Sequence, residues 1–202
     1  MWQTRHGRIE RRINRMTAGN VFAISDFLDI ASAKTVSKTL TRLEEEMIIE
    51  KLMRGIYWKP CEKNGKRTAL SPSELARAIA RGNSWKLAPS GETALYLFGA
   101  DKNEPTNWTY VTDGPYRVYA FDGFTISFKH TSGKQLSLGS EKVLLFIQVL
   151  KAYGKERLTA EVLARIRGVL KLDEIEEIKR ESINMTEWMS GAVKRMLGYQ
   201  LA

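Results

Sequence analysis

Hydrophobic and polar residues between positions 33 and 47 alternate with a helical period. Val36, Leu40, Leu43 and Met47 follow one another at spacings of four, three and four residues. Such spacing places the four side chains on one face of an α-helix, where they form an apolar stripe. We therefore expect a helix whose stripe packs against a core, with Ser32 as its N-cap.

Another face of the same helix is basic in its N-terminal half. Lysine or arginine recurs every four residues, with threonine hydroxyls at 35, 39 and 41 nearby, whereas residues 44–46 are all glutamate, which phosphates would repel. This polarity favours insertion of the N-terminal half into a DNA major groove. A face covered by water alone is the alternative. The residues predicted to face the groove are Lys34, Thr35, Ser37, Lys38, Thr41 and Arg42.

A second basic helix is predicted from Thr4 to about Thr17. Ile9, Ile13 and Met16 give it a narrow apolar seam, and arginines cover most of the remaining surface. Guanidinium groups at this density are suited to phosphate contacts. Pairing with acidic residues elsewhere is the alternative, although only Glu10 is nearby in sequence. The arginines of this helix predicted to contact phosphates are Arg8, Arg11, Arg12 and Arg15.

The elements around these helices are predicted in the order of a winged helix-turn-helix. A short strand at 20–23 and a short helix capped by Ser25 precede the basic helix of residues 33–47. The β-rich runs 48–53 and 56–59 follow it, and Gly55 between them suits the positive φ of a tight hairpin. Arg54 would lie at the tip of this wing, against the minor groove or the DNA backbone. A hairpin that only closes a small core, with Arg54 in water, is the alternative.

The rest of the chain predicts a mixed α+β domain. Helices are expected from about 71 and 90, and strands at 85–89, 108–112, 116–121 and 124–130, with a further strand-like run at 135–138. From Ser140 onward the pattern is helical, with Asp173 and Glu176 resembling a capping box. The predicted fold class is α+β, an N-terminal winged helix-turn-helix followed by a mixed α+β domain with a C-terminal helical section. The predicted domains are 1–60, a linker at 61–70, and 71–202.

Charge is unevenly distributed along the 202 residues. The net charge is +9, and residues 1–67 hold 14 Lys and Arg against 8 Asp and Glu, whereas residues 68–202 hold 18 against 15. A basic N-terminal part is the electrostatic footprint expected of a nucleic-acid-binding module. A basic protein without a polyanionic partner is the alternative.

The cellular compartment is predicted from what the sequence lacks. No apolar run approaches the roughly 20 residues of a membrane span, and the N-terminus has no apolar segment typical of a secretory signal. Cys61 is the only cysteine, so no internal disulfide can form, which fits a reducing compartment. We expect a cytoplasmic protein that does not associate with membranes.

Residue types needed for catalysis are sparse. His6 and His130 are the only histidines, so a Cys/His zinc cluster is excluded. Neither a phosphate-binding GxxxxGK[ST] loop nor a GxSxG nucleophile motif is present. Asp113 and Asp122 each precede a glycine, and turn chemistry accounts for both. We therefore predict neither an enzyme nor a metal or cofactor site.

Several motifs in order resemble the AbiEi-type antitoxins of bacterial toxin–antitoxin and phage-abortive-infection systems. The resemblance runs nearly end to end. Residues 100–105 read ADKNEP and depart from that family's Leu-Ser-Thr-Gln-Val-Pro-like loop, of which they keep only the proline. The resemblance is carried by RGIYWKP at 54–60, LSPSELARAIARGNSWKLAPSGETAL at 70–95, YVTDGPYRVY at 110–119, ISFKH at 126–130 and Thr-Glu-Trp-Met at 186–189.

This resemblance implies a DNA-binding antitoxin. Such a protein represses its own operon through the winged helix at inverted-repeat operator DNA, while its C-terminal domain helps to neutralise a nucleotidyltransferase-like toxin. One alternative is an orphan transcriptional regulator whose C-terminal domain senses a ligand or dimerises. Another is a winged helix that contacts only proteins. The oligomeric state is left open by the sequence.

Overall fold

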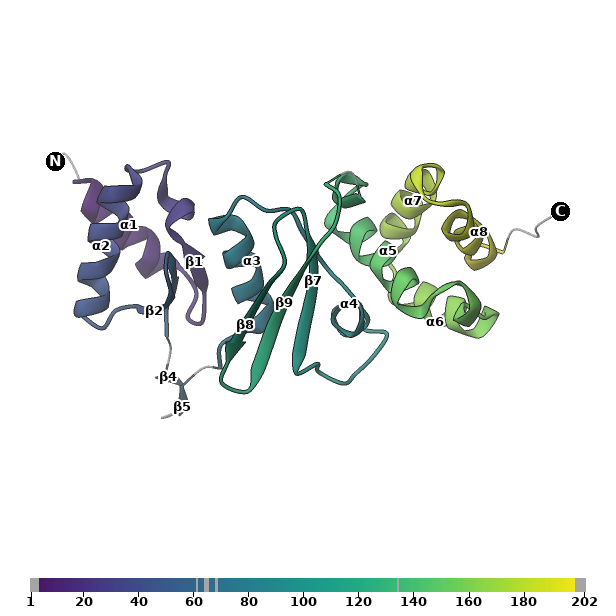
Figure 1. Ribbon diagram of the computed structural model, residues 1–202, viewed down its shortest axis with the longest axis horizontal. Helices are drawn as coiled ribbons and strands as arrows, with labels where there is room; N and C mark the ends of the chain where they lie inside the picture. The colour runs from purple at the N-terminus through teal and green to yellow at the C-terminus, as the bar shows by residue number, and fades with distance from the viewer. Residues whose placement is uncertain (1–3, 61, 64–65, 68, 134, 199–202) are drawn as a thin grey trace. The chain divides into compact units, whose positions relative to one another are not determined.

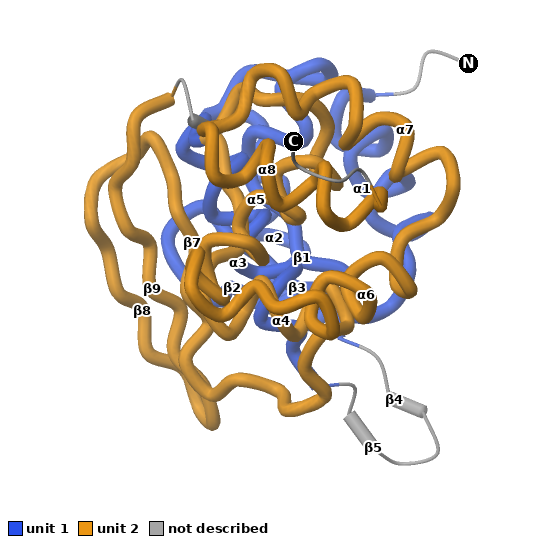
Figure 2. The backbone as a smooth tube through the Cα atoms, turned by 90° about the vertical axis from the view of Figure 1, so that its right-hand side faces the viewer, with its two compact units in different colours: residues 1–85 blue, residues 86–202 orange. Residues whose placement is uncertain are grey.

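The computed structural model of the protein describes residues 4–60, 62–63, 66–67, 69–133 and 135–198. The chain divides into two compact units, residues 1–85 and residues 86–202 (Figure 2). The division follows the helix that begins at Pro72, whereas the sequence places a linker before that helix, at 61–70. Four residues of the expected linker, Cys61, Asn64, Gly65 and Thr68, lie outside the described residues.

The first unit combines three α-helices with short strands (Figure 1). Three of the strands form one sheet in the order β1-β3-β2, and the other two pair as a separate hairpin. The elements are α1 (Arg5–Arg15), β1 (Val21–Ala23), the 3₁₀ helix η1 (Ile24–Phe27), α2 (Ala33–Glu45), β2 (Glu50–Met53), β3 (Ile56–Trp58), β4 (Glu62–Lys63), β5 (Lys66–Arg67) and α3 (Pro72–Gly82).

Helix α1 begins where the sequence predicts but ends earlier. The Thr4 hydroxyl accepts a hydrogen bond from the Gly7 amide at 3.2 Å and caps the helix. Ile9 and Ile13 are fully buried, which confirms the apolar seam. The helix ends at Arg15 because Met16 takes an extended backbone conformation.

Helix α2 has the predicted apolar stripe except at its last member. Val36, Leu40 and Leu43 are fully buried, whereas Met47 is 86% exposed, so the prediction that Met47 faces the core is wrong. The helix ends at Glu45, and Met47 adopts a left-handed backbone with φ of 57°. The Ile48 amide then bonds back to the Leu43 carbonyl at 2.9 Å, which closes the helix and turns the chain toward the sheet.

The hairpin of β2 and β3 forms as predicted. Its turn is Arg54-Gly55, and Gly55 has a φ of +79°, a conformation that side-chain-bearing residues rarely adopt. The element before α2 is a short helix, as predicted, but it is one 3₁₀ turn whose N-cap is Ala23, so the prediction that Ser25 caps it is wrong. Asp26 determines this local shape, since its carboxylate accepts the Ala23 amide at 2.9 Å.

Helix α3 packs against β1, η1 and β3 and therefore belongs to the first unit. Ser71 caps it and Pro72 occupies its first turn, where a missing backbone N–H costs no hydrogen bond. Gly82 at its end lies so close to β3 that a Cβ atom there would be 3.2 Å from the Ile56 side chain. A side chain at this position would therefore require the Ile56 side chain to shift by a few tenths of an ångström.

The second unit is a four-stranded sheet followed by a helical stretch (Figure 1). The sheet order is β6-β7-β9-β8, with β7 and β9 parallel and the other pairs antiparallel. The elements are β6 (Leu87–Pro89), α4 (Glu92–Phe98), β7 (Asn107–Thr112), β8 (Arg117–Phe121), β9 (Phe124–His130), η2 (Gln135–Ser137), α5 (Glu141–Tyr153), η3 (Lys155–Arg157), α6 (Ala160–Val169), α7 (Leu172–Glu181), η4 (Ser182–Asn184) and α8 (Glu187–Met196).

The strand-like run predicted at 135–138 is wrong. Residues Gln135–Ser137 form the 3₁₀ helix η2, in which the Leu136 amide bonds to the Gly133 carbonyl at 3.2 Å. The segment therefore satisfies its backbone locally rather than in the sheet. Leu136 is nevertheless buried, and it packs with Ala88 and Leu144.

The helical pattern predicted from Ser140 onward begins with α5, which buries seven of its residues from 143 to 150. The cap of α7 differs from the prediction, because the carboxylate that accepts the N-cap amide of Lys171, at 3.0 Å, belongs to Glu174 rather than to Asp173 or Glu176. The fold class is mixed α+β with a C-terminal helical stretch. Among the described residues, no helix is both long enough and apolar enough to span a bilayer.

Candidate nucleic-acid interface

The polar face predicted on helix α2 is exposed. Lys34, Lys38, Thr41 and Arg42 are exposed to solvent, and Thr35 and Ser37 are half-buried. Lys34 and Lys38 make no side-chain hydrogen bond or ion pair within the described residues. The structure therefore presents a basic, hydroxyl-bearing helix face on the side opposite the buried Val36 and Leu43.

The threonine hydroxyls of α2 have different surroundings. The Thr35 hydroxyl bonds to the Ser32 hydroxyl at 3.1 Å, at the N-cap position of the helix. The pKa of Tyr57, near Thr41 of the same helix, is raised by burial and by the nearby Glu44, and the Thr41 hydroxyl partly offsets this rise. Thr39 is only 4% exposed, so the expectation that it adds a donor near the DNA face is wrong.

Thr39 instead joins α1 to α2. Its hydroxyl donates to the Thr35 carbonyl at 3.0 Å and lies 3.1 Å from Nδ1 of His6. Since the hydroxyl hydrogen is already given to the carbonyl, its oxygen accepts the Nδ1 hydrogen of His6. The histidine therefore helps to hold the two helices together.

The acidic end of α2 influences one of the basic residues. Glu46 accepts a hydrogen bond from Nε of Arg42 at 2.8 Å, and this bond raises the pKa of the arginine. Both side chains are exposed, so the pair contributes little to stability. Its effect is to direct the Arg42 guanidinium toward the C-terminal end of the helix.

The arginines of α1 gather around a shallow surface depression of about 310 Å³. Arg8 and Arg15 are exposed and make no hydrogen bond or ion pair within the described part of the chain. Arg11 donates to the Gly7 carbonyl at 3.1 Å. Ile30, on the turn that leads into α2, completes a lining that otherwise consists of Arg8, Arg11, Arg12 and Arg15.

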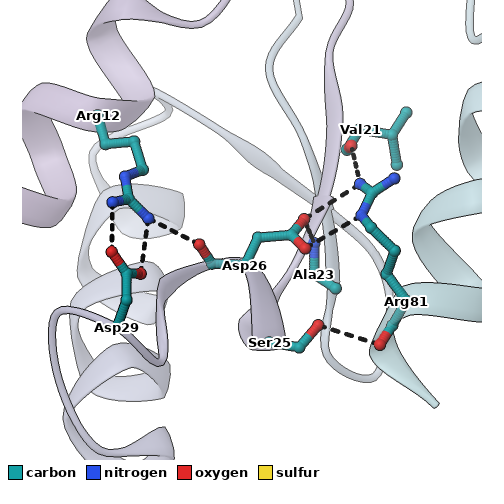
Figure 3. Close-up of polar contacts among 7 residues, drawn as sticks. All are labelled: Arg12, Val21, Ala23, Ser25, Asp26, Asp29 and Arg81. Carbon is teal, nitrogen blue, oxygen red and sulfur yellow. Dashed lines mark hydrogen bonds and ion pairs between the residues drawn. The ribbon is translucent and has the colours of Figure 1, made fainter. Parts of the chain in front are cut away.

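Arg12 fits the alternative expected for the arginines of α1, because it pairs with an acidic residue elsewhere in the chain. Its guanidinium donates to both carboxylate oxygens of Asp29, at 2.8 and 2.6 Å, and to the Asp26 carbonyl at 2.8 Å (Figure 3). It also lies over the ring of Phe27, 5.7 Å from the centroid. The hydrogen bonds from Arg12 lower the pKa of Asp29. This arginine therefore fixes the turn before α2.

Asp26 extends this network to α3. Its carboxylate accepts from Nε and Nη2 of Arg81 at 3.0 and 3.1 Å, and Arg81 also donates to the Val21 carbonyl at 3.2 Å (Figure 3). The Ser25 hydroxyl donates to the Arg81 carbonyl. Asp26 and Arg81 thus tie η1 to the end of α3.

Lys59 is a second structural cation that sequence reasoning missed. Its ammonium donates to the carbonyls of Ile13, Asn14 and Met16 at 2.9 to 3.0 Å. These carbonyls lie at the C-terminal end of α1, where the helix leaves acceptors without intrahelical donors. A basic residue 43 to 46 positions away in sequence gives no pattern from which this contact could be read.

Arg54 lies apart from the two helices, on the turn between β2 and β3. It is exposed, and in the described residues its side chain makes no hydrogen bond or ion pair. The neighbouring Gly55 carbonyl accepts the Ile24 amide at 3.0 Å, which anchors the turn to η1. The candidate residues therefore form a helix face, an arginine depression and a hairpin tip.

His130 and Asp113, which were considered as catalytic candidates, both make hydrogen bonds to the backbone. Nδ1 of His130 lies 2.9 Å from the Gly114 carbonyl, and Asp113 accepts the Lys86 amide at 2.8 Å. No group of three or more metal-ligating side chains occurs among the residues that the structure describes.

The family model named "Family of unknown function (DUF6088)" matches residues 8–178. The chain belongs to the DUF6088 family. None of the curated proteins matches the chain. Among solved structures, the crystal structure of the RV2827C protein from Mycobacterium tuberculosis is similar, with 13% sequence identity and a TM-score of 0.41. The match covers 96% of this chain and 71% of that one. A likeness at this level adds no argument about the function of this DUF6088 member.

Proposed function

We propose that the first unit of the protein is a winged helix-turn-helix that binds operator DNA, and that the protein represses its own toxin–antitoxin operon. The order of elements supports this proposal, since helix α1, strand β1, the short helix η1, helix α2 and the β2–β3 hairpin follow one another as in a winged helix. In this proposal α2 is the recognition helix and the hairpin is the wing.

The observation that carries the proposal is the exposed basic face of α2. Lys34 and Lys38 extend into solvent one turn apart, without partners in the described structure. A recognition helix needs such a face, because phosphates supply much of the binding free energy and base edges are read by side chains that reach into the groove. The buried stripe behind it holds the helix rigidly on the unit.

Phosphate contacts on either side of that helix are assigned to α1 and to the wing. Arg8, Arg11 and Arg15 surround a depression whose lining includes Ile30, on the turn that leads into α2. Arg54 extends from the hairpin tip. Arg12 stays in the proposal only as the residue that orients this turn, because Asp29 and Asp26 hold its guanidinium.

The antitoxin part of the proposal is supported by the resemblance to AbiEi-type antitoxins. On this basis the second unit neutralises a nucleotidyltransferase-like toxin encoded beside the protein. Co-expression of that neighbouring protein with the full chain tests it. Restored growth supports an antitoxin, whereas growth inhibition that the full chain does not relieve would favour an orphan regulator.

DNA binding is tested by gel shift of the full chain on its own upstream DNA and on a scrambled duplex, at two salt concentrations. Preference for the upstream DNA that persists at the higher salt supports a specific repressor. Lys38→Ala and Arg42→Ala are each expected to weaken binding and to reduce the slope of log affinity against log salt by about one. Lys102→Ala, an exposed lysine of the second unit, is the matched control. Unchanged binding by both α2 variants would refute the assignment.

A further inference from the structure

The second unit has a large groove in its C-terminal helical stretch. Two cavities of about 1030 Å³ and about 360 Å³ adjoin there, and both are lined by Met185 and Trp188. Residues of η3, η4 and α8 line the larger cavity, and residues of α5, η4 and α8 line the smaller one. The groove therefore runs across several helical elements.

Apolar side chains make up most of the lining of the smaller cavity. Ile147, Met185, Trp188 and Met189 are among them. At the larger cavity Ile183 is 86% exposed, which is unusual for an isoleucine in a folded chain. Aromatic and methionine side chains are enriched where proteins bind one another, because they bury a large area and adapt to a partner's shape.

The charges of the groove are predominantly positive. Lys155, Lys194 and Arg195 line the larger cavity, are exposed, and make no side-chain hydrogen bond or ion pair within the described residues. Lys151 lines the smaller cavity, where burial lowers the pKa of its ammonium group. Two carboxylates, Glu156 and Glu187, line the larger cavity as well. The apolar floor thus has a mainly cationic rim.

This chemistry favours a protein segment over other occupants. A nucleic acid could pair its phosphates with the cations of the rim, but it would leave the apolar floor around Met185, Trp188 and Met189 in water. A second copy of this chain would bring a net charge of +9 against a cationic rim. An amphipathic helix with acidic flanks matches both the floor and the rim.

We propose that the groove around Trp188 binds an amphipathic helix of a partner protein, with apolar residues on the floor and carboxylates against Lys155, Lys194 and Arg195. Eight of the twelve residues that line the larger cavity follow residue 178, where the match to the family model ends. Most of the lining of the larger cavity therefore lies outside the matched segment, whereas Lys155 and the α5 residues of the smaller cavity lie within it. Identifying the partner as the toxin rests on the proposed function, whereas the chemistry of the groove does not.

The test uses the full chain and a fluorescently labelled synthetic peptide of about 15 residues, with leucines at i, i+4 and i+7 and glutamates on the other face. A counterpart with lysine at every glutamate position is the second probe. Fluorescence anisotropy is expected to show binding of the glutamate peptide at least about tenfold tighter than that of the lysine peptide. Equal binding of the two peptides would overturn the proposal.

Variants locate the binding site. Ile183→Asp and the double variant Lys194→Glu/Arg195→Glu change exposed side chains, so folding is preserved. Each is expected to weaken binding of the glutamate peptide by about tenfold or more. Leu172→Asp, at a residue 84% exposed outside the groove, and Arg165→Glu/Lys179→Glu are matched controls that should bind as the original chain does. Loss of binding in the controls, or none in the groove variants, would overturn the assignment.

Two further measurements distinguish a partner helix from other occupants of the groove, and a gel shift tests the proposed function independently of the groove. Displacement of the peptide by an unrelated single-stranded DNA would show that the groove binds nucleic acid and would overturn the proposal. A dimer in sedimentation that Ile183→Asp dissociates would show that the groove binds a second copy of this chain, which would also overturn it. The groove variants should retain the full gel shift on upstream DNA. Failure of DNA binding by the unmodified chain would refute the proposed function and leave the peptide result standing.

Discussion

Arg8 and Arg12 lie one turn apart on α1 but have different surroundings. Arg12 is held by Asp29 and the Asp26 carbonyl, whereas Arg8 is exposed. We expect Arg12→Ala to lower the Tm by several degrees, because the turn before α2 loses its anchor. Arg8→Ala should leave the Tm unchanged and reduce the salt slope of DNA binding by about one. Thermal melts and gel shifts of both variants check this, and equal effects on Tm would contradict the distinction.

Lys59 stabilises the end of α1 through three carbonyl oxygens. Substitution by methionine keeps the apolar stem but removes the donors, so the free energy of unfolding should fall by about 2 kcal/mol. Urea denaturation measures this change. Lys51→Met, at an exposed lysine on β2, is the control and should alter stability little. A loss as large in the control would show that the carbonyl contacts are not the cause.

Glu174 makes stability depend on pH. Its pKa lies below the ordinary value of 4.5, first because the carboxylate accepts the Lys171 amide and also because it pairs with Lys142 at 3.0 Å. Since the unfolded chain binds this proton more tightly, the stabilisation is complete above pH 4.5 and is lost as the pH falls through the lower, folded-state pKa.

We therefore expect Glu174→Gln to be less stable than the original chain at neutral pH. The difference in Tm should shrink as the pH is lowered from 7 toward 3. Thermal melts of both proteins at a series of pH values check this. A difference that stays constant over the series would show that the carboxylate's charge is not responsible.

Single residues were the level at which the sequence was least informative. Exposure of Lys34, Lys38 and Arg54 followed from helical period and turn chemistry, both of which are local. The roles of Arg12 and Lys59 depend on partners that folding brings together, 14 to 17 and 43 to 46 residues away. Charge counts treat all cations alike, so they cannot separate a phosphate contact from an internal anchor.

At the scale of the element, the acidic C-terminal end of helix α2 holds one of the basic residues proposed to contact DNA. Glu46 holds Arg42, and phosphates would be repelled by the same carboxylate. We expect Glu46→Gln to tighten binding to upstream DNA by about threefold, because it releases the guanidinium as well as removing a negative charge. Glu45→Gln removes the same charge without releasing Arg42, so its effect should be smaller. Gel-shift titrations compare the two, and a larger effect of Glu45→Gln would contradict this account.

Most elements could be predicted from the sequence because their signals are local. The β2–β3 hairpin, the strands joined by Asp-Gly turns and the apolar α5 all formed where expected. The exceptions were short. Residues 135–138 and the segment after Ser25 became 3₁₀ helices, since a few residues carry too little periodicity to distinguish a strand or an α-helix from a turn.

At the scale of the whole chain, α3 decides where the first unit ends. Because α3 packs on β1 and η1, a fragment of residues 1–85 should fold, whereas residues 1–70 should not. Circular dichroism and thermal melts of the two fragments check this. A cooperative transition in the shorter fragment, at the same Tm, would show that α3 is dispensable and that the boundary expected from the sequence is adequate.

The bridge between Asp26 and Arg81 constrains how these two positions can change during evolution. Its two residues lie 55 positions apart, and both carboxylate oxygens of Asp26 accept hydrogen bonds from the Arg81 guanidinium. A change of Asp26 alone leaves the guanidinium beside the Val21 carbonyl without its counter-ion, and a change of Arg81 alone leaves a carboxylate bound only to the Ala23 amide. Among relatives of this chain, the two positions are therefore expected to change together, and an alignment of the family should show them as a covarying pair.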